Sequence, residues 1–100
     1  PFIDISAPEN TSVCAVLDGT VIASEWNDRS GYTIQIQHPD DMVSIYRHNE
    51  KLLKNAGDKV TAGTPVAVVG NTGERAAGAH LQFELWHKGE AVDPSRYIAF

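Results

Sequence analysis

Hydrophobic residues recur at every second position in several short segments of this 100-residue chain. Residues 3–5, 32–37, 42–48 and 80–86 alternate in this way, and residues 66–69 form a continuous apolar run. Successive side chains of a strand point to opposite faces, so this period predicts half-buried β-strands, and the apolar run predicts a fully buried one. Stretches rich in Gly, Pro, Asn and Asp separate the segments and predict turns. Many short strands in close succession indicate a compact all-β fold, either a sandwich or a barrel.

Two more elements are predicted from turn and cap residues. An Asp-Gly pair at 18–19 separates residues 13–17 from residues 20–26. This dipeptide readily takes the positive φ angles of a tight turn, so we expect the two segments to pair as a hairpin. Residues 49–56 are the only helical candidate, with Asn49 as the N-cap. The chain is therefore expected to form a small antiparallel sheet with one short helix.

The segment at residues 80–86 has two chemically different faces. Its odd-numbered side chains are apolar: Leu81, Phe83 and Leu85. Its even-numbered side chains are mostly polar: His80, Gln82, Glu84 and Trp86. Residues two apart on a strand project in parallel, so this polar face offers a histidine and a second donor to one ligand. We expect any chemistry on this strand to lie on its even-numbered face.

Residues 42–48 form a second strand whose two faces are expected to differ. Alternation assigns Val43 and Ile45 to the core. Tyr46 and His48 then lie together on the opposite face, where polar groups are expected.

Composition narrows the range of functions. Eight Lys and Arg residues against 13 Asp and Glu residues give a net charge of -5. This is the wrong sign for binding phosphates, so no nucleic-acid partner is expected. No apolar run approaches the roughly 18 residues of a membrane-spanning helix. The length suits a single small domain over residues 1–100, and because the sequence starts at Pro1 without Met we expect a domain of a longer, exported protein.

Four residues suited to metal binding or proton transfer are predicted on the non-core side of strands or at strand ends: Asp4, His48, His80 and Gln82. A zinc hydrolase needs three nitrogen or oxygen ligands, an open position for water and a nearby base. Alternation along separate strands does not show that these side chains converge. In the simpler interpretation, Asp4 caps a turn, His48 is a surface histidine and His80 bonds to the backbone. His38 and His87 precede turns and are predicted as exposed loop histidines.

The chain resembles the lysostaphin-type, LytM-like zinc endopeptidases in a series of motifs that occur in the same order and spacing. These are IDISAP (3–8), DGTV (18–21), YRH (46–48), AGDKVTAG (56–63), VGNTG (69–73) and HLQFELW (80–86). Together they cover essentially the whole chain, which makes the resemblance far more specific than any one motif. It implies a β-sheet groove fold related to the barrel-sandwich hybrids, and cleavage of peptide cross-bridges in bacterial peptidoglycan outside the cytoplasm.

Three motifs make the site of that family: His-x-Gly-x-Asp, Tyr-x-His and His-x-His. The first supplies two zinc ligands, the second a catalytic histidine, and the third a catalytic histidine followed by the last ligand. The resemblance implies that Asp4 is a zinc ligand and that His48 and His80 are the catalytic histidines. Gln82 stands where the last ligand is expected and Phe2 where the glycine is expected. The first histidine would fall outside the chain.

These departures weaken the implied metal site. An amide offers zinc only a carbonyl oxygen, a much poorer donor than imidazole, so Gln82 disfavours binding. The Phe2 ring would fill the space beside Asp4 that a glycine leaves open. We therefore expect no zinc or other cofactor, and we interpret the chain as a degenerate pseudopeptidase. Family members of this kind imply a groove that recognises a peptidoglycan peptide or regulates a cell-wall hydrolase such as an amidase, in the periplasm or outside the cell.

Two other interpretations stay open. In the first, the chain is an active zinc endopeptidase, with a histidine upstream and Gln82 or a neighbour completing an unusual site. In the second, it is a biotinyl- or lipoyl-like carrier, because the segments at 18–21 and 57–63 are also turn patterns of barrel-sandwich hybrids. Such carriers present a lysine at a hairpin tip between small or Met residues, a setting that neither Lys59 nor Lys88 has.

Overall fold

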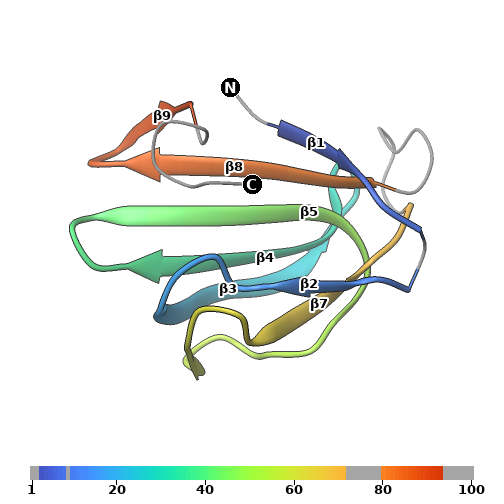
Figure 1. Cartoon of the computed structure of the whole chain (residues 1–100), viewed down its shortest axis with the longest axis horizontal. Coiled ribbons are helices and arrows are strands. Elements are labelled where there is room, and N and C mark those ends of the chain that lie inside the picture. Colours follow the sequence, from blue (N-terminus) through green and yellow to red (C-terminus); the bar gives the residue numbers. More distant parts are fainter. Residues whose placement is uncertain (1–2, 9, 72–79, 94–100) are drawn as a thin grey trace.

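The computed structural model describes residues 3–8, 10–71 and 80–93, and strands make up most of them (Figure 1). The strands in these residues are β1 (Ile3–Ser6), β2 (Ser12–Cys14), β3 (Gly19–Asn27), β4 (Gly31–His38), β5 (Met42–Leu52), β6 (Lys59–Val60), β7 (Pro65–Val69), β8 (His80–His87) and β9 (Glu90–Val92). No helix occurs in this part of the chain, so it contains none that could span a membrane. The predicted all-β class is confirmed.

Strand β5 organises the sheet because it pairs with three other strands. The main order is β1-β8-β5-β4-β3-β6, and every pair along it is antiparallel. The last residues of β5 also pair with β7, which pairs with β2, and β9 extends the sheet beside β8. Figure 1 shows β8, β5 and β4 running side by side. The result is a curled sheet, partly closed by the β2–β7 pair.

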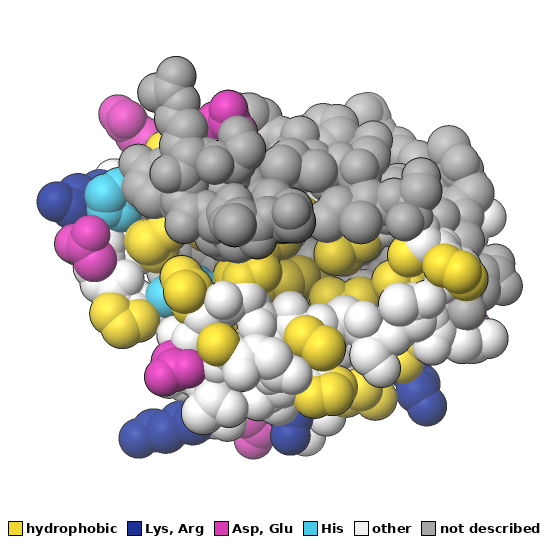
Figure 2. All heavy atoms as spheres, viewed as in Figure 1, with side chains coloured by type: hydrophobic (Ala, Val, Ile, Leu, Met, Phe, Trp, Pro, Cys, Tyr) yellow, Lys and Arg dark blue, Asp and Glu magenta, His cyan; other side chains and the backbone are white. Residues whose placement is uncertain are grey.

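The hydrophobic core takes side chains from the curled sheet and from the β2–β7 pair: Val13, Ala15, Val21, Ile34, Ile36, Tyr46, Val60, Val66, Ala67, Val69, Phe83 and Leu85. The rings of Tyr46 and Phe83 are register partners on β5 and β8, with centroids 5.3 Å apart. Phe83 and Leu85 are fully buried, which confirms the predicted apolar face of β8. Figure 2 shows a band of hydrophobic side chains on one side of the molecule.

The predicted faces of β5 are wrong. Tyr46 pairs with Phe83 and Ser44 with Leu85, so Ser44 and Tyr46 share the core face. Ile45 is buried as well, but on the opposite face of the sheet. Apolar residues therefore occupy both faces of β5, and alternation alone could not tell which face meets the core.

The predicted hairpin around Asp18-Gly19 is also wrong, because β2 pairs with β7 while β3 pairs with β4 and β6. The Asp18 carboxylate accepts a hydrogen bond from the Ala62 N–H at 2.8 Å, which fixes the turn against the segment before β7. A Cβ at Gly19 would lie only 2.3 Å from the Gln37 carbonyl oxygen. Glycine is required here for the close approach of β3 to β4, rather than for a two-residue hairpin.

The predicted helix at residues 49–56 does not form. Residues 49–52 continue β5, where Asn49 is the register partner of Val69 and Leu52 that of Ala67. Pairing with β7 satisfies backbone groups that a helix would have bonded internally, and it covers the buried residues of β7. Asn49 is buried in the sheet instead of capping a helix.

His38 is buried, which corrects the prediction of an exposed loop histidine. Its Nδ1 donates to the Asp18 carbonyl oxygen at 2.8 Å, and its Nε2 accepts from the Ser44 hydroxyl at 2.6 Å. Ser44 in turn lies 2.8 Å from the Tyr46 hydroxyl, which accepts from the Val16 N–H at 3.2 Å. Since the Asp18 carbonyl can only accept, Nδ1 of His38 carries a proton. In the neutral form of His38, Nε2 therefore accepts from Ser44, which in turn accepts from the Tyr46 hydroxyl.

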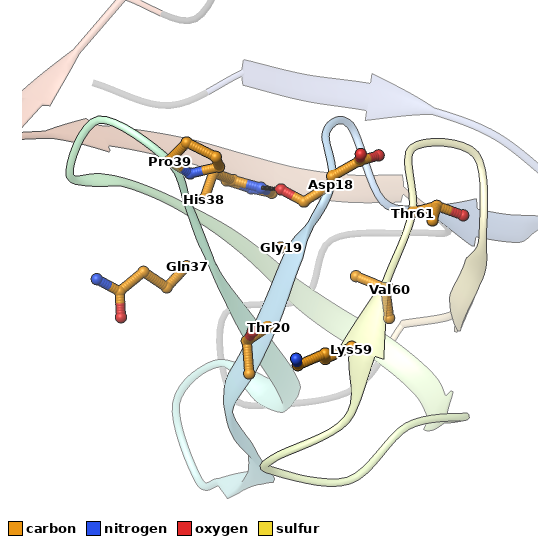
Figure 3. Close-up of a pocket in the computed structure, with 9 residues that line it drawn as sticks. All are labelled: Asp18, Gly19, Thr20, Gln37, His38, Pro39, Lys59, Val60 and Thr61. Atoms are coloured by element: carbon orange, nitrogen blue, oxygen red, sulfur yellow. Dashed lines mark hydrogen bonds between the residues drawn. The ribbon is translucent and has the colours of Figure 1, made fainter.

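Burial favours the neutral forms of the two ionisable members of this chain, His38 and Tyr46. Burial lowers the pKa of His38, although the bond to the Asp18 carbonyl and the charge of Asp18 act in the opposite direction. Burial likewise raises the pKa of Tyr46. His38 also borders a cavity of about 520 Å³ between β3, β4 and β6, and Figure 3 shows Gly19 in the middle of the residues that line it. His87, the other predicted loop histidine, is half-buried at the end of β8, with Nε2 3.1 Å from Asp40 Oδ2.

Candidate functional site

The polar side of β5 is shaped by a β-bulge. Tyr32 pairs with Asn49 and Ile34 with Tyr46, so three steps along β5 stand opposite two along β4. His48 lies in this extra stretch with a φ of 65°, a left-handed conformation that residues other than glycine seldom adopt. The bulge interrupts the alternation of side chains. It turns His48 toward Gln82, while Tyr46 stays in the core.

Hydrogen bonds on both sides hold the bulge in place. The Asn49 side chain is 1% exposed, and its Nδ2 donates to the carbonyl oxygens of Tyr32 at 2.9 Å and Tyr46 at 3.0 Å. The His48 N–H donates to the Ser30 carbonyl oxygen at 2.7 Å, in the turn between β3 and β4. The backbone of His48 is therefore tied to the β3–β4 turn, and its position does not depend on any ligand.

His48 and Gln82 form the central contact of the site. His48 is 2% exposed, and its Nε2 lies 3.0 Å from Gln82 Oε1. An amide oxygen only accepts hydrogen bonds, so Nε2 carries the proton and donates it. In this bond the Nε2 proton is donated to one lone pair of the Gln82 oxygen.

Arg47 lies on the same face, as the register partner of Gln82. Its Nη2 is 3.2 Å from Glu84 Oε2, and the other oxygen of Glu84 accepts from Trp86 Nε1, also at 3.2 Å. The Nη1 atom of Arg47 is buried and has no hydrogen-bond partner among the residues that the structure describes. Buried donors are nearly always paired, so this atom marks a position where an acceptor is missing.

These side chains border a cavity of about 340 Å³. The described residues that line it are all polar: Asn27, Arg29, Ser30, Arg47, His48 and Gln82. Asn27 ends β3, Arg29 and Ser30 lie in the β3–β4 turn, and β5 and β8 contribute the others. Sequence reasoning expected His48 and Gln82 here, and the structure brings them together.

The other predicted site residues are placed only in part. Asp4 is the register partner of Gln82, so the backbone of β1 brings it beside that position. His80 begins β8 opposite Ser6. Phe2 lies outside the described residues, as do the side chains of Asp4 and His80. The roles implied for these residues therefore stay predictions.

The donor set at position 82 does not fit a zinc site well. Zinc at this position would have to share the Gln82 amide oxygen with His48, because one of its two lone pairs already accepts the Nε2 proton. A neutral amide oxygen is also a weak donor for this metal. Among the side chains that the structure describes, no three His, Cys, Asp or Glu residues lie close enough to hold a metal ion together.

Sequence reasoning missed the contributions of Arg47, Asn49 and Arg29. Arg47 could have been predicted if the pairing of β5 with β8 had been known, because that pairing places Arg47 opposite Gln82 on the same face. Asn49 looked like a helix cap, since asparagine favours that position as well as irregular backbone. Arg29 belongs to a turn whose approach to β5 depends on the bulge, and no local pattern encodes it.

Comparisons with known proteins give the chain close relatives. The model of Peptidase family M23 matches residues 2–94. The murein hydrolase activator EnvC of Escherichia coli is 35% identical over 94 residues, which is 94% of this chain and 22% of the relative. The murein hydrolase activator NlpD of Escherichia coli is 37% identical over 98 residues, which is 96% of this chain and 25% of the relative. The chain thus spans about a quarter of the length of these relatives.

A solved structure shows the same fold. The catalytic domain of the antimicrobial peptidase lysostaphin from Staphylococcus simulans superimposes with a TM-score of 0.86 at 26% identity, covering 94% of this chain and 74% of that one. The predicted groove fold is therefore confirmed. Proteins similar to this chain include both hydrolase activators and a peptidase.

Proposed function

Because this chain belongs to peptidase family M23, we propose that it is a regulatory domain of the bacterial cell envelope that stimulates a murein hydrolase and does not itself cleave peptidoglycan. Two relatives, EnvC and NlpD, are named murein hydrolase activators. Another is named outer membrane antigenic lipoprotein B, of Haemophilus influenzae, and is 38% identical over 98 residues. These names support both the activity and a location in the envelope.

The observation that carries the proposal is the 3.0 Å contact between His48 Nε2 and Gln82 Oε1. A metallopeptidase of this fold needs a metal ligand at position 82 and a histidine able to exchange a proton with the reacting groups. Here Nε2 of His48 bonds to the residue that stands in the ligand position, and that residue is a neutral amide, a weak donor for zinc. This arrangement supports a cleft that binds rather than one that hydrolyses.

Metal analysis tests the lost zinc site. The unaltered protein, purified in zinc-containing buffer, is expected to carry much less than one zinc per chain. A restored form would combine Gln82→His and Phe2→Gly with a histidine placed two residues before position 2. Only this form is expected to bind zinc, because it alone has the full ligand set. The Gln82→His change alone is the matched control, and tight stoichiometric zinc in the unaltered protein would contradict the proposal.

Digestion of purified peptidoglycan tests the regulatory role. The protein alone should release no soluble fragments, whereas adding it to a purified murein amidase should increase the fragments which that amidase releases. Release by the protein alone would identify an active endopeptidase instead. Absence of any stimulation across several murein hydrolases would remove the support for an activator.

A further inference from the structure

The cavity beside His48 contains a guanidinium group whose hydrogen bonding is incomplete. Nη2 of Arg47 is paired with Glu84, but Nη1 is buried without an acceptor. A buried charged donor that has lost its water partners destabilises the state in which it is left unpaired. Because Arg47 lines the cavity, an acceptor that enters it and bonds to the guanidinium would remove this penalty.

The charge of the cavity selects the kind of acceptor. Its described lining holds two guanidinium groups, Arg29 and Arg47, and no carboxylate. Guanidinium groups bind carboxylates through two parallel, charge-assisted hydrogen bonds. Glu84 already balances part of the Arg47 charge from outside this lining, so the cavity suits one carboxylate rather than a polyanion.

An exposed aromatic pair lies on the same β3–β4 hairpin that supplies Asn27, Arg29 and Ser30 to the cavity lining. Trp26 is 50% and Tyr32 39% exposed, and their rings meet edge to face with centroids 4.9 Å apart. The Trp26 indole N–H donates to Asp28 Oδ1 at 2.9 Å, which holds the ring in position. Rigid Trp, Tyr and Arg side chains are enriched among the residues that dominate protein–protein affinity. The neighbouring pair therefore favours a protein segment over a free anion.

We infer that this cavity binds the carboxylate of an Asp or Glu side chain presented by a protein partner, with Arg47 as the main contact and Trp26 and Tyr32 packing against the same segment. The inference rests on the proposed function, because the partner is the hydrolase that the domain stimulates. It adds the chemical group that the partner must supply.

Titration with small probes tests the carboxylate pocket without knowledge of the partner. The probes are N-acetyl-glutamate N-methylamide and its neutral glutamine analogue, followed by amide chemical shifts in NMR spectra of the protein. The glutamate probe should shift the signals of Arg29, His48 and Gln82, and the glutamine probe should bind at least about tenfold more weakly, the usual effect of losing a charge-assisted pair. Equal binding of the two probes would overturn the inference.

Variants identify the residue that binds the probe. Arg47→Gln should lower the affinity for the glutamate probe by about tenfold or more. Glu84→Gln should raise the affinity for the glutamate probe, because the carboxylate that competes for Arg47 is removed. This variant keeps the test valid if Arg47→Gln fails to fold. Lys51→Gln, on the same strand, removes one positive charge outside the cavity and should change binding by less than about twofold. An unchanged or weaker affinity in Glu84→Gln would contradict the pocket.

Two further measurements separate this inference from the proposed function. A soluble murein stem peptide that binds more tightly than the glutamate probe, through the same signals, would replace the protein partner with the cell wall. If Arg47→Gln still stimulates a murein amidase fully, the inference fails and the proposed function stands. If the unaltered protein binds the glutamate probe but stimulates no hydrolase, the pocket stands and the proposed function fails.

Discussion

His38 and His48 are both buried on adjacent strands, yet they occupy different kinds of structure. His38, 4% exposed, ends β4, and its two ring nitrogens belong to a chain of hydrogen bonds in which every donor meets an acceptor. His48, 2% exposed, lies in a bulge next to a polar cavity and to the unpaired Nη1 of Arg47. Burial therefore does not indicate which histidine belongs to the candidate functional site. The two histidines differ in whether the hydrogen bonds around them are complete.

The region around His38 is expected to respond to mutation through stability, and the region around His48 through binding. Complete networks rigidify a core, and removing one member leaves its neighbours without partners. Both histidines border a cavity, but among the described lining residues only Arg47, in the cavity beside His48, has an unmet donor. Water or a ligand can replace a lost contact there, so that loss is less damaging to the fold.

The substitution Gly19→Ala should have the largest effect. Its Cβ would lie 2.3 Å from the Gln37 carbonyl oxygen and 2.8 Å from His38 Nδ1, so β3 and β4 would have to separate where the His38 chain begins. We expect a loss of about 3 kcal/mol or more in the free energy of unfolding, measured with urea at pH 7. Gly89→Ala is the control, because nothing lies within 4 Å of its Cβ and only its φ of +81° adds strain. Equal losses in the two variants would show that β3 and β4 are not closely packed.

The substitution Tyr46→Phe tests the hydrogen-bonded chain itself. Without the hydroxyl, the Val16 N–H loses its acceptor and Ser44 loses a donor, while the ring still packs on Phe83. The expected loss is about 1–3 kcal/mol in the free energy of unfolding, the usual cost of leaving a buried polar group unpaired. Binding of the glutamate probe to the folded protein should stay unchanged. A lower affinity for the glutamate probe would mean that the regions around His38 and His48 are coupled.

The sequence was sufficient where the pattern is local and regular. Strict alternation predicted β4 and the apolar face of β8, and the series of family motifs predicted the groove fold. Alternation failed on β5 because both of its faces carry apolar residues, and it failed at His48 because a bulge adds one residue to the strand. A bulge depends on how one strand pairs with its neighbour, so it leaves no signal in the residue pattern of the bulged strand alone.

Long-range contacts also explain the other errors. The Asp18-Gly19 pair looked like a hairpin turn, but the close approach of β3 to β4 is what requires the glycine. Asn49 looked like a helix cap, but pairing with β7 outweighed this local preference. His38 precedes a proline turn, and its burial follows from the position of Asp18 and Ser44 around it. In the site, spacing and resemblance found His48 and Gln82, whereas Arg29 and the orphan atom of Arg47 required the folded structure.

The pH dependence of stability tests the neutral state of His38. Burial holds its pKa below the value of about 6.5 expected in the unfolded chain, so the unfolded state takes up this proton first as the pH falls. The contribution of His38 should be fully present above pH 6.5 and decline below it, with a slope of at most about 1.4 kcal/mol per pH unit. Urea unfolding between pH 5 and 8 should show that His38→Gln removes this component. Because the other histidines remain in both proteins, the difference between the two curves isolates His38, and a flat difference would contradict its buried neutral state.

The smallest stability effect is expected at Gln82→Ala. The substitution removes the acceptor of His48 Nε2, but this contact borders the cavity, where water can take the place of the amide oxygen. We expect a loss of about 1 kcal/mol or less in the free energy of unfolding, below that of Tyr46→Phe. Urea unfolding of the two variants at pH 7 compares them directly. A loss at Gln82 as large as that at Tyr46 would mean that the His48 region is as tightly packed as the core, since only a closed site would prevent water from satisfying the ring.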